Sequence, residues 1–231
     1  MLHLQTVTPA LLNIIRTISA EPFFQPFRLV GGTGLSLQLG HRISVDADFF
    51  SNKAFDQEEA MVVLSRILPG FLLLKKSAHG FAGIHEGVKI DLYTWGMSFL
   101  LPPTEAEGMR LAALPDVAAL KFEAIINRKE EKDFRDVHAL LHRFSMAELI
   151  GFFQERYPHH NPKMLTDHLL AAPFVERDLT IPLFTQITWE QLCTEIVRAV
   201  GNFYEEKRKY REEVEKERLR QRFDEIQKRK K

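Results

Sequence analysis

One segment of the sequence, residues 28–50, combines residue types that can bind a metal ion and a polyphosphate. It reads RLVGGTGLSLQLGHRISVDADFF, in which two glycines and a threonine are followed by an Asp-x-Asp pair. Gly31 and Gly32 let the backbone approach phosphate groups closely, and free N–H groups at the start of a following helix favour bound anions. The segment therefore predicts chemistry on a phosphorylated ligand.

The Asp-x-Asp pair is predicted to hold a divalent cation. Residues i and i+2 of a strand point to the same face, so Asp46 and Asp48 are expected to place their carboxylates side by side. Two such carboxylates repel each other unless a cation lies between them, and oxygen ligands suit Mg²⁺ or Mn²⁺. Asp91, in the apolar stretch VKIDLYTW, is the expected third carboxylate of this metal site.

A predicted helix over residues 115–129 supplies cations that can neutralise phosphate charge. Lys121 lies four residues after Val117 and four before Ile125, which places it at the edge of the apolar face. Arg128 follows on the same side of the helix. Two cations that project past a buried face suit a triphosphate or a pyrophosphate.

Other polar residues near these groups have two alternative roles. Asp133 and Asp136 either orient the helix lysine or contact the nucleotide, or they belong to structural ion pairs such as Lys132 with Asp136 at i,i+4. Arg42 and Ser44 precede the Asp-x-Asp pair, where they either face the nucleotide or shape the turn. The sequence leaves both pairs of alternatives open.

His138 and His142, four residues apart on one predicted helix, are a weaker candidate for a metal pair. No Glu or third ligand accompanies them in the sequence, so a helix surface is the expectation. Cys193 is the only cysteine, which excludes an intramolecular disulfide framework and a Cys-rich zinc site. It is expected in the core.

The elements that must position these residues form a mixed αβ half followed by a helical half. Hydrophobic periodicity and turn residues predict strands over 27–30, 45–50, 71–75, 81–85 and 88–95, and helices over 9–20, 57–68, 115–129, 131–144, 145–156 and 189–204. A short helix is expected after the glycines, and residues 157–182 show no clear pattern. The predicted domains are an αβ domain over 1–110, a helical domain that completes the site over 111–203, and a charged helical tail over 204–231.

Composition excludes several classes of protein. The chain has 231 residues, of which 45% are hydrophobic and 27% charged, as is typical of a soluble globular protein. Lys+Arg and Asp+Glu are equal at 31 each, which excludes a polybasic nucleic-acid coat and an acidic disordered chain. The N-terminal segment is predicted as an amphipathic helix rather than a signal peptide or membrane span. A cytoplasmic protein with no membrane contact is therefore expected.

The balanced total hides a basic tail. Residues 204–231 carry 12 Lys+Arg and 8 Asp+Glu, a net charge of +4, so the rest of the chain carries −4. The tail has no Gly or Pro and alternates charge sign, which is typical of a solvated helix. A helix that docks a partner or touches RNA is the alternative.

The order strand, Gly-Gly-Thr, short helix, Asp-x-Asp and later strand Asp resembles the nucleotidyltransferase (polymerase-β-like) superfamily. More narrowly, GGTGLSLQLGHRISVDADFF followed by DVAALKFEAIINRKEEKDFRDVHALL resembles the AbiEii/AbiGii-type nucleotidyltransferase toxin family, over residues 28–145 and more loosely to about residue 200. The superfamily often has Ser at Gly32 or Thr33 and a branched apolar residue at Ala47, but neither departure removes a metal ligand. The resemblance implies an α+β fold: a nucleotidyltransferase-type mixed β-sheet with flanking helices, then a helical C-terminal domain and a charged helical tail.

The resemblance also implies roles for the matching residues. The metal ligands, which are also catalytic, would be Asp46, Asp48 and Asp91, with Lys121 as the catalytic cation. Together with the residues weighed above, the expected nucleotide-binding set is Gly31, Gly32, Thr33, Arg42, Ser44, Arg128 and Asp133. The implied reaction transfers NMP from an NTP to an acceptor hydroxyl, with Mg²⁺ or Mn²⁺ as cofactor and pyrophosphate as the second product.

The family further implies the toxin of a toxin–antitoxin or abortive-infection system. The implied partners are a tRNA or other RNA acceptor and a cognate antitoxin protein. Two alternatives remain: an enzyme that modifies a protein hydroxyl, and a non-enzymatic module that senses nucleotide or acts as a scaffold. A retired active site has no physical need for three clustered carboxylates, which argues against the non-enzymatic alternative.

Overall fold

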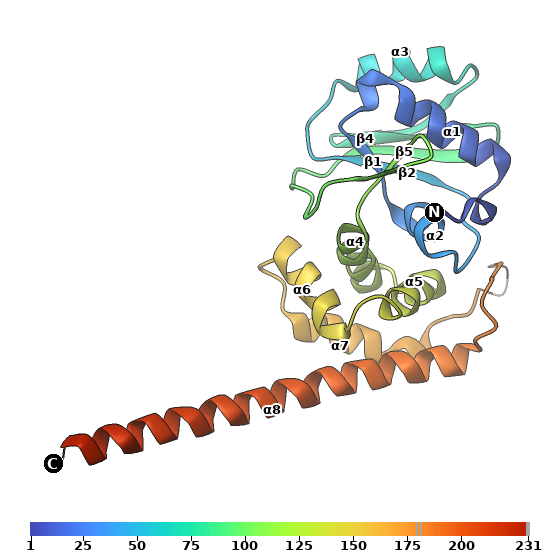
Figure 1. The fold of residues 1–231 in the computed structure, drawn as a ribbon. Coiled ribbons are helices and arrows are strands. Elements are labelled where there is room, and N and C mark those ends of the chain that lie inside the picture. The colour runs from blue at the N-terminus through green and yellow to red at the C-terminus, as the bar shows by residue number, and fades with distance from the viewer. Residues whose placement is uncertain (179, 181, 230–231) are drawn as a thin grey trace.

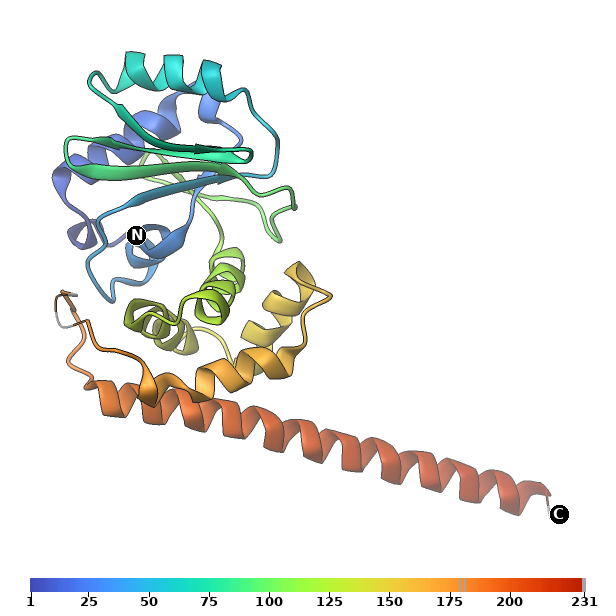
Figure 2. The same ribbon diagram turned by 180° about the vertical axis from the view of Figure 1, so that it is seen from behind.

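A computed structural model describes residues 1–178, 180 and 182–229; it shows a sheet layer, a helical layer and a long C-terminal helix (Figures 1 and 2). The seven strands lie in the order β3-β4-β5-β2-β1-β7-β6. Their bounds are β1 Phe27–Leu29, β2 Ala47–Ser51, β3 Leu72–Ser77, β4 Gly80–His85, β5 Val88–Thr94, β6 Thr104–Ala106 and β7 Met109–Leu111. The sheet is mixed, because β2 pairs parallel with β5 and antiparallel with β1.

The helices divide between the two layers. Near the sheet lie α1 Pro9–Ala20, α2 Gly31–Leu39 and α3 Gln57–Ile67; the helical layer holds α4 Leu114–Asn127, α5 Glu131–Leu141, α6 Met146–Arg156, α7 Pro162–Leu170 and α8 Trp189–Arg229. Three short 3-10 helices cover Leu4–Thr6, Pro22–Phe24 and Ala172–Phe174. The predicted α+β class, with a mixed sheet, flanking helices and a helical C-terminal part, is therefore confirmed.

Local capping explains where several helices begin. The Thr8 side chain accepts a hydrogen bond from the N–H of Leu11, directly before a proline at the first position of α1. Ser145 and Glu148 form a capping box at the start of α6, in which each side chain is bonded to the other residue's backbone. These signals lie within a few residues of one another, so the sequence alone could indicate them.

Two hydrophobic cores meet at α2. Leu37 packs into the core around the sheet, α1 and α3, whereas Leu35 packs into the core shared by α4 to α8. The same change occurs at the end of the sheet, because Leu111 belongs to the first core and Ala112 to the second. The glycine turn that begins α2 therefore lies between the two layers.

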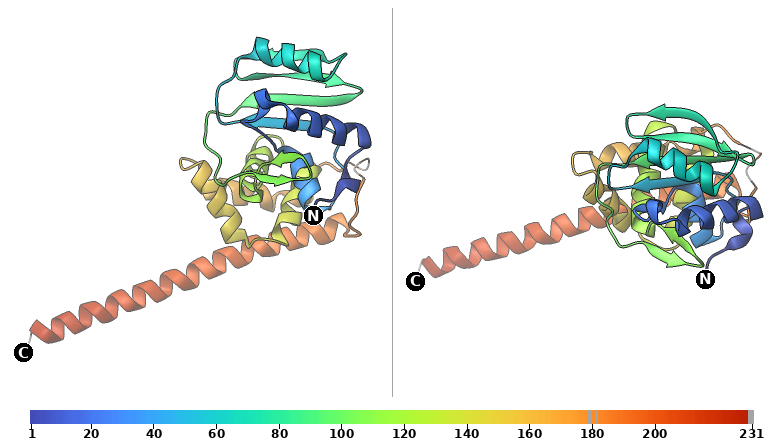
Figure 3. Two further views of the ribbon diagram at one scale, coloured as in Figure 1. Left: turned by 45° about the horizontal axis from the view of Figure 1, so that its top comes forward. Right: turned by 90° about the horizontal axis from the view of Figure 1, so that it is seen from above.

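Four elements differ from the sequence expectation. The strands β6 and β7 were not predicted, and α7 lies within the segment that showed no clear pattern. The helix predicted over 189–204 does not end there, because α8 continues through the tail to Arg229 and projects away from the rest of the molecule (Figure 3). Tyr210, Val214 and Leu219 are exposed on this projecting part. No helix within residues 1–178 or 182–229 is long and apolar enough to cross a membrane.

Candidate active site

Two of the three predicted carboxylates lie side by side at the middle of the sheet, and the third lies near them. Asp48 on β2 and Asp91 on β5 are direct partners in the parallel register. Asp46 lies one residue before β2, and its charge acts on the carboxyl group of Asp48. Side chains at paired positions of adjacent strands point to the same face, so the two strand aspartates share one face of the sheet.

The electrostatics of this acidic cluster are those of closely spaced like charges. Burial, followed by the charges of Asp91 and Asp46, raises the pKa of Asp48 from 3.8 to about 6, although the charges of Lys121 and Lys89 oppose the shift. In the absence of a cation, ionisation of Asp48 is thus less favourable than that of an exposed aspartate. A bound divalent cation would stabilise the ionised form.

Asp91 has one oxygen paired and one unpaired. Its Oδ2 accepts a hydrogen bond from Nζ of Lys89 at 2.6 Å. Its Oδ1 is buried and has no hydrogen-bond partner among the described residues. An unpaired carboxylate oxygen beside two further carboxylates fits the oxygen-rich environment that Mg²⁺ or Mn²⁺ requires.

The glycine turn lies directly against this cluster. Gly31 has a φ of 64°, and a methyl group added there would overlap the carboxylate of Asp48. A methyl group on Gly32 would overlap the guanidinium of Arg42. The start of α2 can approach the acidic cluster because Gly31 lacks a side chain, whereas the missing side chain of Gly32 leaves room for Arg42. The helix N-terminus, which favours anions, therefore lies beside the predicted metal ligands.

Thr33 and Ser44 are buried and bonded to each other. The Thr33 hydroxyl lies 2.8 Å from Oγ of Ser44 and 2.5 Å from the carbonyl oxygen of Asp46. Thr33 is fully buried, and the side chain of Ser44 is nearly so. The two hydroxyls thus hold the segment before β2 against the start of α2. This geometry fits a role in positioning Asp46.

Lys121 is buried between two carboxylates of α5. Its Nζ lies 2.6 Å from Oδ2 of Asp136 and 3.2 Å from Oδ1 of Asp133. Of the sequence alternatives for the two aspartates, orienting the helix lysine matches these contacts. The proposed pair of Lys132 with Asp136 was wrong, because Lys132 instead lies 2.8 Å from a carboxylate oxygen of Glu130.

Asp136 joins the helical layer to the segment after α2. It accepts two hydrogen bonds from the guanidinium of Arg42, at 2.7 and 2.9 Å, and lies 2.6 Å from Nε2 of His41. Burial alone would raise the pKa of Asp136, but the charges of Arg42 and Lys121 and the hydrogen bond to His41 bring it well below its usual value. Arg42 is itself buried, which matches the turn-shaping one of its two alternatives.

Arg128 is the more accessible of the two predicted phosphate-facing cations. Its guanidinium donates two hydrogen bonds of 2.8 Å to the carboxylate of Asp133, while its side chain stays 46% exposed. The charge of Asp48 also acts on Arg128, which places this cation in the field of the acidic cluster. Arg128 can therefore contact a ligand without leaving Asp133.

Three residues that contact predicted site residues or the histidine pair were not identified from the sequence. Lys89 had a readable signal, because it lies two residues before Asp91 on the same strand and hence on the same face. His41 had none, since its partner Asp136 is 95 residues away. Glu195 was also missed: it lies 2.7 Å from Nε2 of His138, which is buried rather than on the helix surface as expected. Cys193 is buried, as predicted.

Comparisons with known proteins agree with this fold. The family model described as nucleotidyl transferase AbiEii toxin, Type IV TA system, matches residues 13–78, which confirms the resemblance found in the sequence. An uncharacterized protein of Aquifex aeolicus is 31% identical over 140 residues, covering 57% of this chain. The match covers 66% of the Aquifex protein, slightly less than two thirds of its length.

Two solved structures share the fold over most of their length. JHP933 from Helicobacter pylori is 18% identical with a TM-score of 0.55, and covers 90% of this chain and 98% of its own. MenT4, the nucleotidyltransferase toxin Rv2826c from Mycobacterium tuberculosis, is 14% identical with a TM-score of 0.53 and covers 83% of both chains. At these identities the likeness concerns the fold.

Proposed function

We propose that this protein is a divalent-metal-dependent nucleotidyltransferase that transfers NMP from an NTP to a hydroxyl group of RNA, with tRNA as the first candidate acceptor. The observation that carries the proposal is the position of the acidic cluster, Asp46, Asp48 and Asp91, against the glycine turn at the start of α2. The match of residues 13–78 to the AbiEii toxin family supports the activity and a toxin role with an antitoxin protein as partner. A cytoplasmic location remains part of the proposal.

The acidic cluster would hold Mg²⁺ or Mn²⁺. The raised pKa of Asp48, caused by burial and the neighbouring carboxylates, and the unpaired oxygen of Asp91 both fit a cation at this place. Such an ion would neutralise charge on the nucleotide phosphates and on the attacking oxygen.

The chain's own groups would bind the rest of the nucleotide. The backbone N–H groups of Gly31 and Gly32, at the N-terminus of α2, would donate to phosphate oxygens. Thr33 and Ser44 would contribute by holding the start of α2 in place through their hydrogen bond. Arg42 would contribute by holding α5 in place through its hydrogen bonds to Asp136. Arg128 would contact the departing pyrophosphate directly. Lys121, which is buried and held by Asp133, would stabilise the negative charge of the pyrophosphate without contacting it.

Transfer then requires one substitution at phosphorus. The acceptor hydroxyl oxygen bonds to the α-phosphorus as the bond from that phosphorus to the α–β bridging oxygen breaks, and pyrophosphate leaves. The hydroxyl proton passes to a carboxylate of the acidic cluster. Asp91, the third carboxylate of the cluster, is the group proposed to accept it.

The proposed domains are 1–110, 111–203 and 204–231. The change of hydrophobic core between Leu111 and Ala112 supports the first boundary. The hydrogen bond between Thr166 and Tyr204 marks where α8 is still attached to the helical layer, and this supports the second boundary. The net positive charge of residues 204–231 favours RNA as the acceptor.

The test is transfer from each of the four α-³²P-labelled NTPs with Mg²⁺, offering total cellular RNA and total soluble protein as acceptors. Labelled RNA is expected with the wild-type chain and none with Asp48→Asn or Asp91→Asn. The matched control is Asp167→Asn, which removes an exposed carboxylate on α7 and should transfer as the wild type does. Label in protein would overturn the RNA acceptor. No label from a folded wild-type chain would favour the sensing or scaffold alternative.

A further inference from the structure

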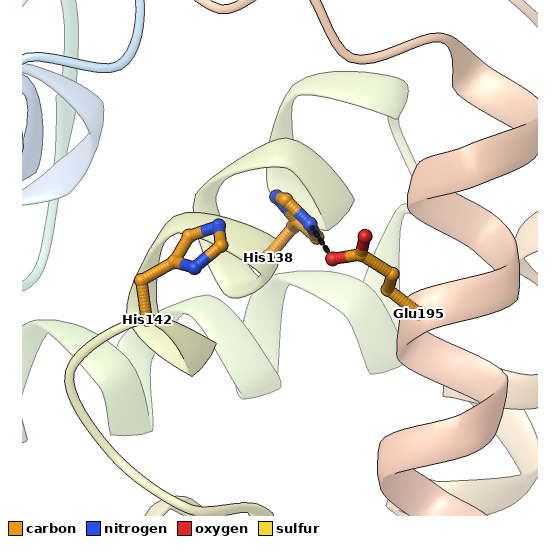
Figure 4. Close-up of side chains that lie close together, drawn as sticks. All are labelled: His138, His142 and Glu195. Atoms are coloured by element: carbon orange, nitrogen blue, oxygen red, sulfur yellow. Dashed lines mark hydrogen bonds and ion pairs between the residues drawn. The ribbon is translucent and has the colours of Figure 1, made fainter.

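A second cluster of metal-ligating side chains lies between α5 and α8. His138 lies on α5, His142 is the C-cap residue directly after that helix and Glu195 lies on α8; one ligand atom from each can be chosen so that all lie within 4.8 Å of one another. Figure 4 shows the two imidazole rings and the carboxylate gathered in the space between the two helices. The cluster shares no residue with the acidic cluster on the sheet.

The geometry of the cluster is set by helix periodicity and by packing. Residues four apart lie on one helix face, and the two imidazole rings meet edge to face with their centroids 4.8 Å apart. Nε2 of His138 lies 2.7 Å from Oε2 of Glu195, although 57 residues separate them. His138 is buried, whereas His142 is exposed, so one ring is fixed and the other is free to turn.

The donor set favours a transition-metal ion. Two imidazole nitrogens and one carboxylate oxygen suit Zn²⁺ and its neighbours in the first row, whereas Mg²⁺ prefers an all-oxygen site such as the acidic cluster. Ligand bonds of about 2.0–2.2 Å in a tetrahedron place ligand atoms about 3.3 Å apart. The largest separation of the ligand atoms is 4.8 Å, and rotation of the exposed His142 ring can shorten it. The 2.7 Å distance between Nε2 of His138 and Oε2 of Glu195 must lengthen by about half an ångström to reach the tetrahedral value.

Both histidines also line a cavity of about 280 Å³, together with Arg135, Arg143 and Leu192. Three protein ligands leave one position of a tetrahedral ion open. The cavity would provide room there for a water molecule or a small anion, whose charge Arg143 would balance, since Arg135 is already paired with Glu131.

We propose that His138, His142 and Glu195 bind one zinc-class divalent ion that joins α8 to α5. Because α5 also carries Asp133 and Asp136, which hold Lys121, the ion would stabilise the helical layer that supports the active-site lysine. The proposal does not depend on the proposed transferase reaction, since it concerns a different set of ligands.

The test uses the tag-free full chain carrying Asp48→Asn and Asp91→Asn, so that the acidic cluster does not compete for metal. After treatment with a chelator, the protein is titrated with Zn²⁺ against a chromophoric chelator, and bound zinc is counted by elemental analysis. One zinc ion per chain is expected, together with a higher melting temperature in Zn²⁺ but not in Mg²⁺. Cobalt substitution should give the absorption bands of a site with nitrogen and oxygen ligands.

Two variants at exposed or half-exposed positions test the ligands without disturbing the core. His142→Gln and Glu195→Gln are each expected to weaken zinc binding by at least about tenfold and to abolish the rise in melting temperature. His159→Gln removes an exposed histidine of a loop and should leave both unchanged. Zinc binding that is equally strong in His142→Gln and in the parent, or a parent that binds no zinc, would overturn the proposal and leave a hydrogen bond between His138 and Glu195.

Discussion

Asp48 and Asp91 are direct partners in the register of β2 and β5, two parallel strands near the middle of the sheet. The backbone fixes this relationship, because parallel pairing sets which residues lie opposite each other. Two carboxylates are therefore held together before any ligand binds. The free energy of their repulsion is present in the metal-free protein and is open to measurement.

Asp48→Asn is expected to stabilise the metal-free protein at neutral and alkaline pH. The folded-state pKa of about 6 lies above the unfolded value of 3.8, so the native state binds more protons, and the wild type loses stability as pH rises through this window. The full shift corresponds to at most about 3 kcal/mol. Urea unfolding with a chelator present, at about pH 8 and about pH 4, should show a gain for the variant only at the higher pH.

Adding Mg²⁺ should make the wild type more stable than Asp48→Asn. The wild type gains stability from binding the ion, whereas Asp48→Asn has lost one of its three carboxylate ligands and gains little. Melting temperatures with and without millimolar Mg²⁺ measure the effect, with Asp167→Asn as the exposed-carboxylate control. An equal gain in the wild type and Asp48→Asn would place the bound Mg²⁺ elsewhere.

Asp136→Asn is expected to destabilise the protein by about 3 kcal/mol or more at neutral pH, because it leaves the buried Lys121 and Arg42 without their shared carboxylate. The pKa of Asp136 is lowered on folding, so its contribution exists above the unfolded value of 3.8 and is lost as pH falls through the folded value. The difference between variant and wild type should therefore shrink in acid. Glu130→Gln, at a half-exposed pair with Lys132, should cost less than about 1 kcal/mol.

Gly31→Ala should abolish transfer and lower the free energy of unfolding by more than Gly70→Ala does. Both glycines have positive φ, so both substitutions introduce backbone strain of about 1–2 kcal/mol. Only at Gly31 does the added methyl group also overlap Asp48, whereas nothing lies within 4 Å of it at Gly70. Transfer assays and urea unfolding of the two variants separate the effects. Full activity in Gly31→Ala would contradict the close approach of α2 to the acidic cluster.

Ending the chain after Lys209 should change the free energy of unfolding by less than about 0.5 kcal/mol, because the projecting residues beyond this point are exposed up to residue 222. Tyr204→Phe is the contrasting variant. It removes the hydroxyl that lies 2.6 Å from Oγ1 of Thr166 and should cost about 1 kcal/mol. Thermal and urea unfolding measure both, and a large loss on truncation would show that the tail packs against the body.

Short-range patterns predicted much of this molecule. The strand, the glycine turn and the Asp-x-Asp pair lie within 23 residues, and their local chemistry indicated both the αβ half and the candidate site. Helices with clear periodicity or caps, such as α1, α5 and α6, were expected within a few residues of their bounds. The strands β6 and β7 have three residues each, too few for a readable alternation.

Contacts between residues far apart in the sequence could not be predicted from the sequence. Nothing in the spacing shows that Asp136 receives Arg42 from 94 residues away, because that contact depends on how the helical layer docks on the sheet. The same holds for Glu195, which joins the two histidines only once α8 packs on α5. In the first case the sequence identified both residues but not their contact, and in the second it identified the two histidines and missed Glu195.

The projecting part of α8 also makes the molecule much longer than its folded body. About 25 residues beyond Tyr204, at 1.5 Å each, extend the helix by about 37 Å, roughly the width of a small domain. Rotational diffusion must therefore be strongly anisotropic, with slow end-over-end tumbling. A macromolecule held at the tip of this helix would lie far enough from the acidic cluster for a second one to occupy the sheet at the same time (Figure 3).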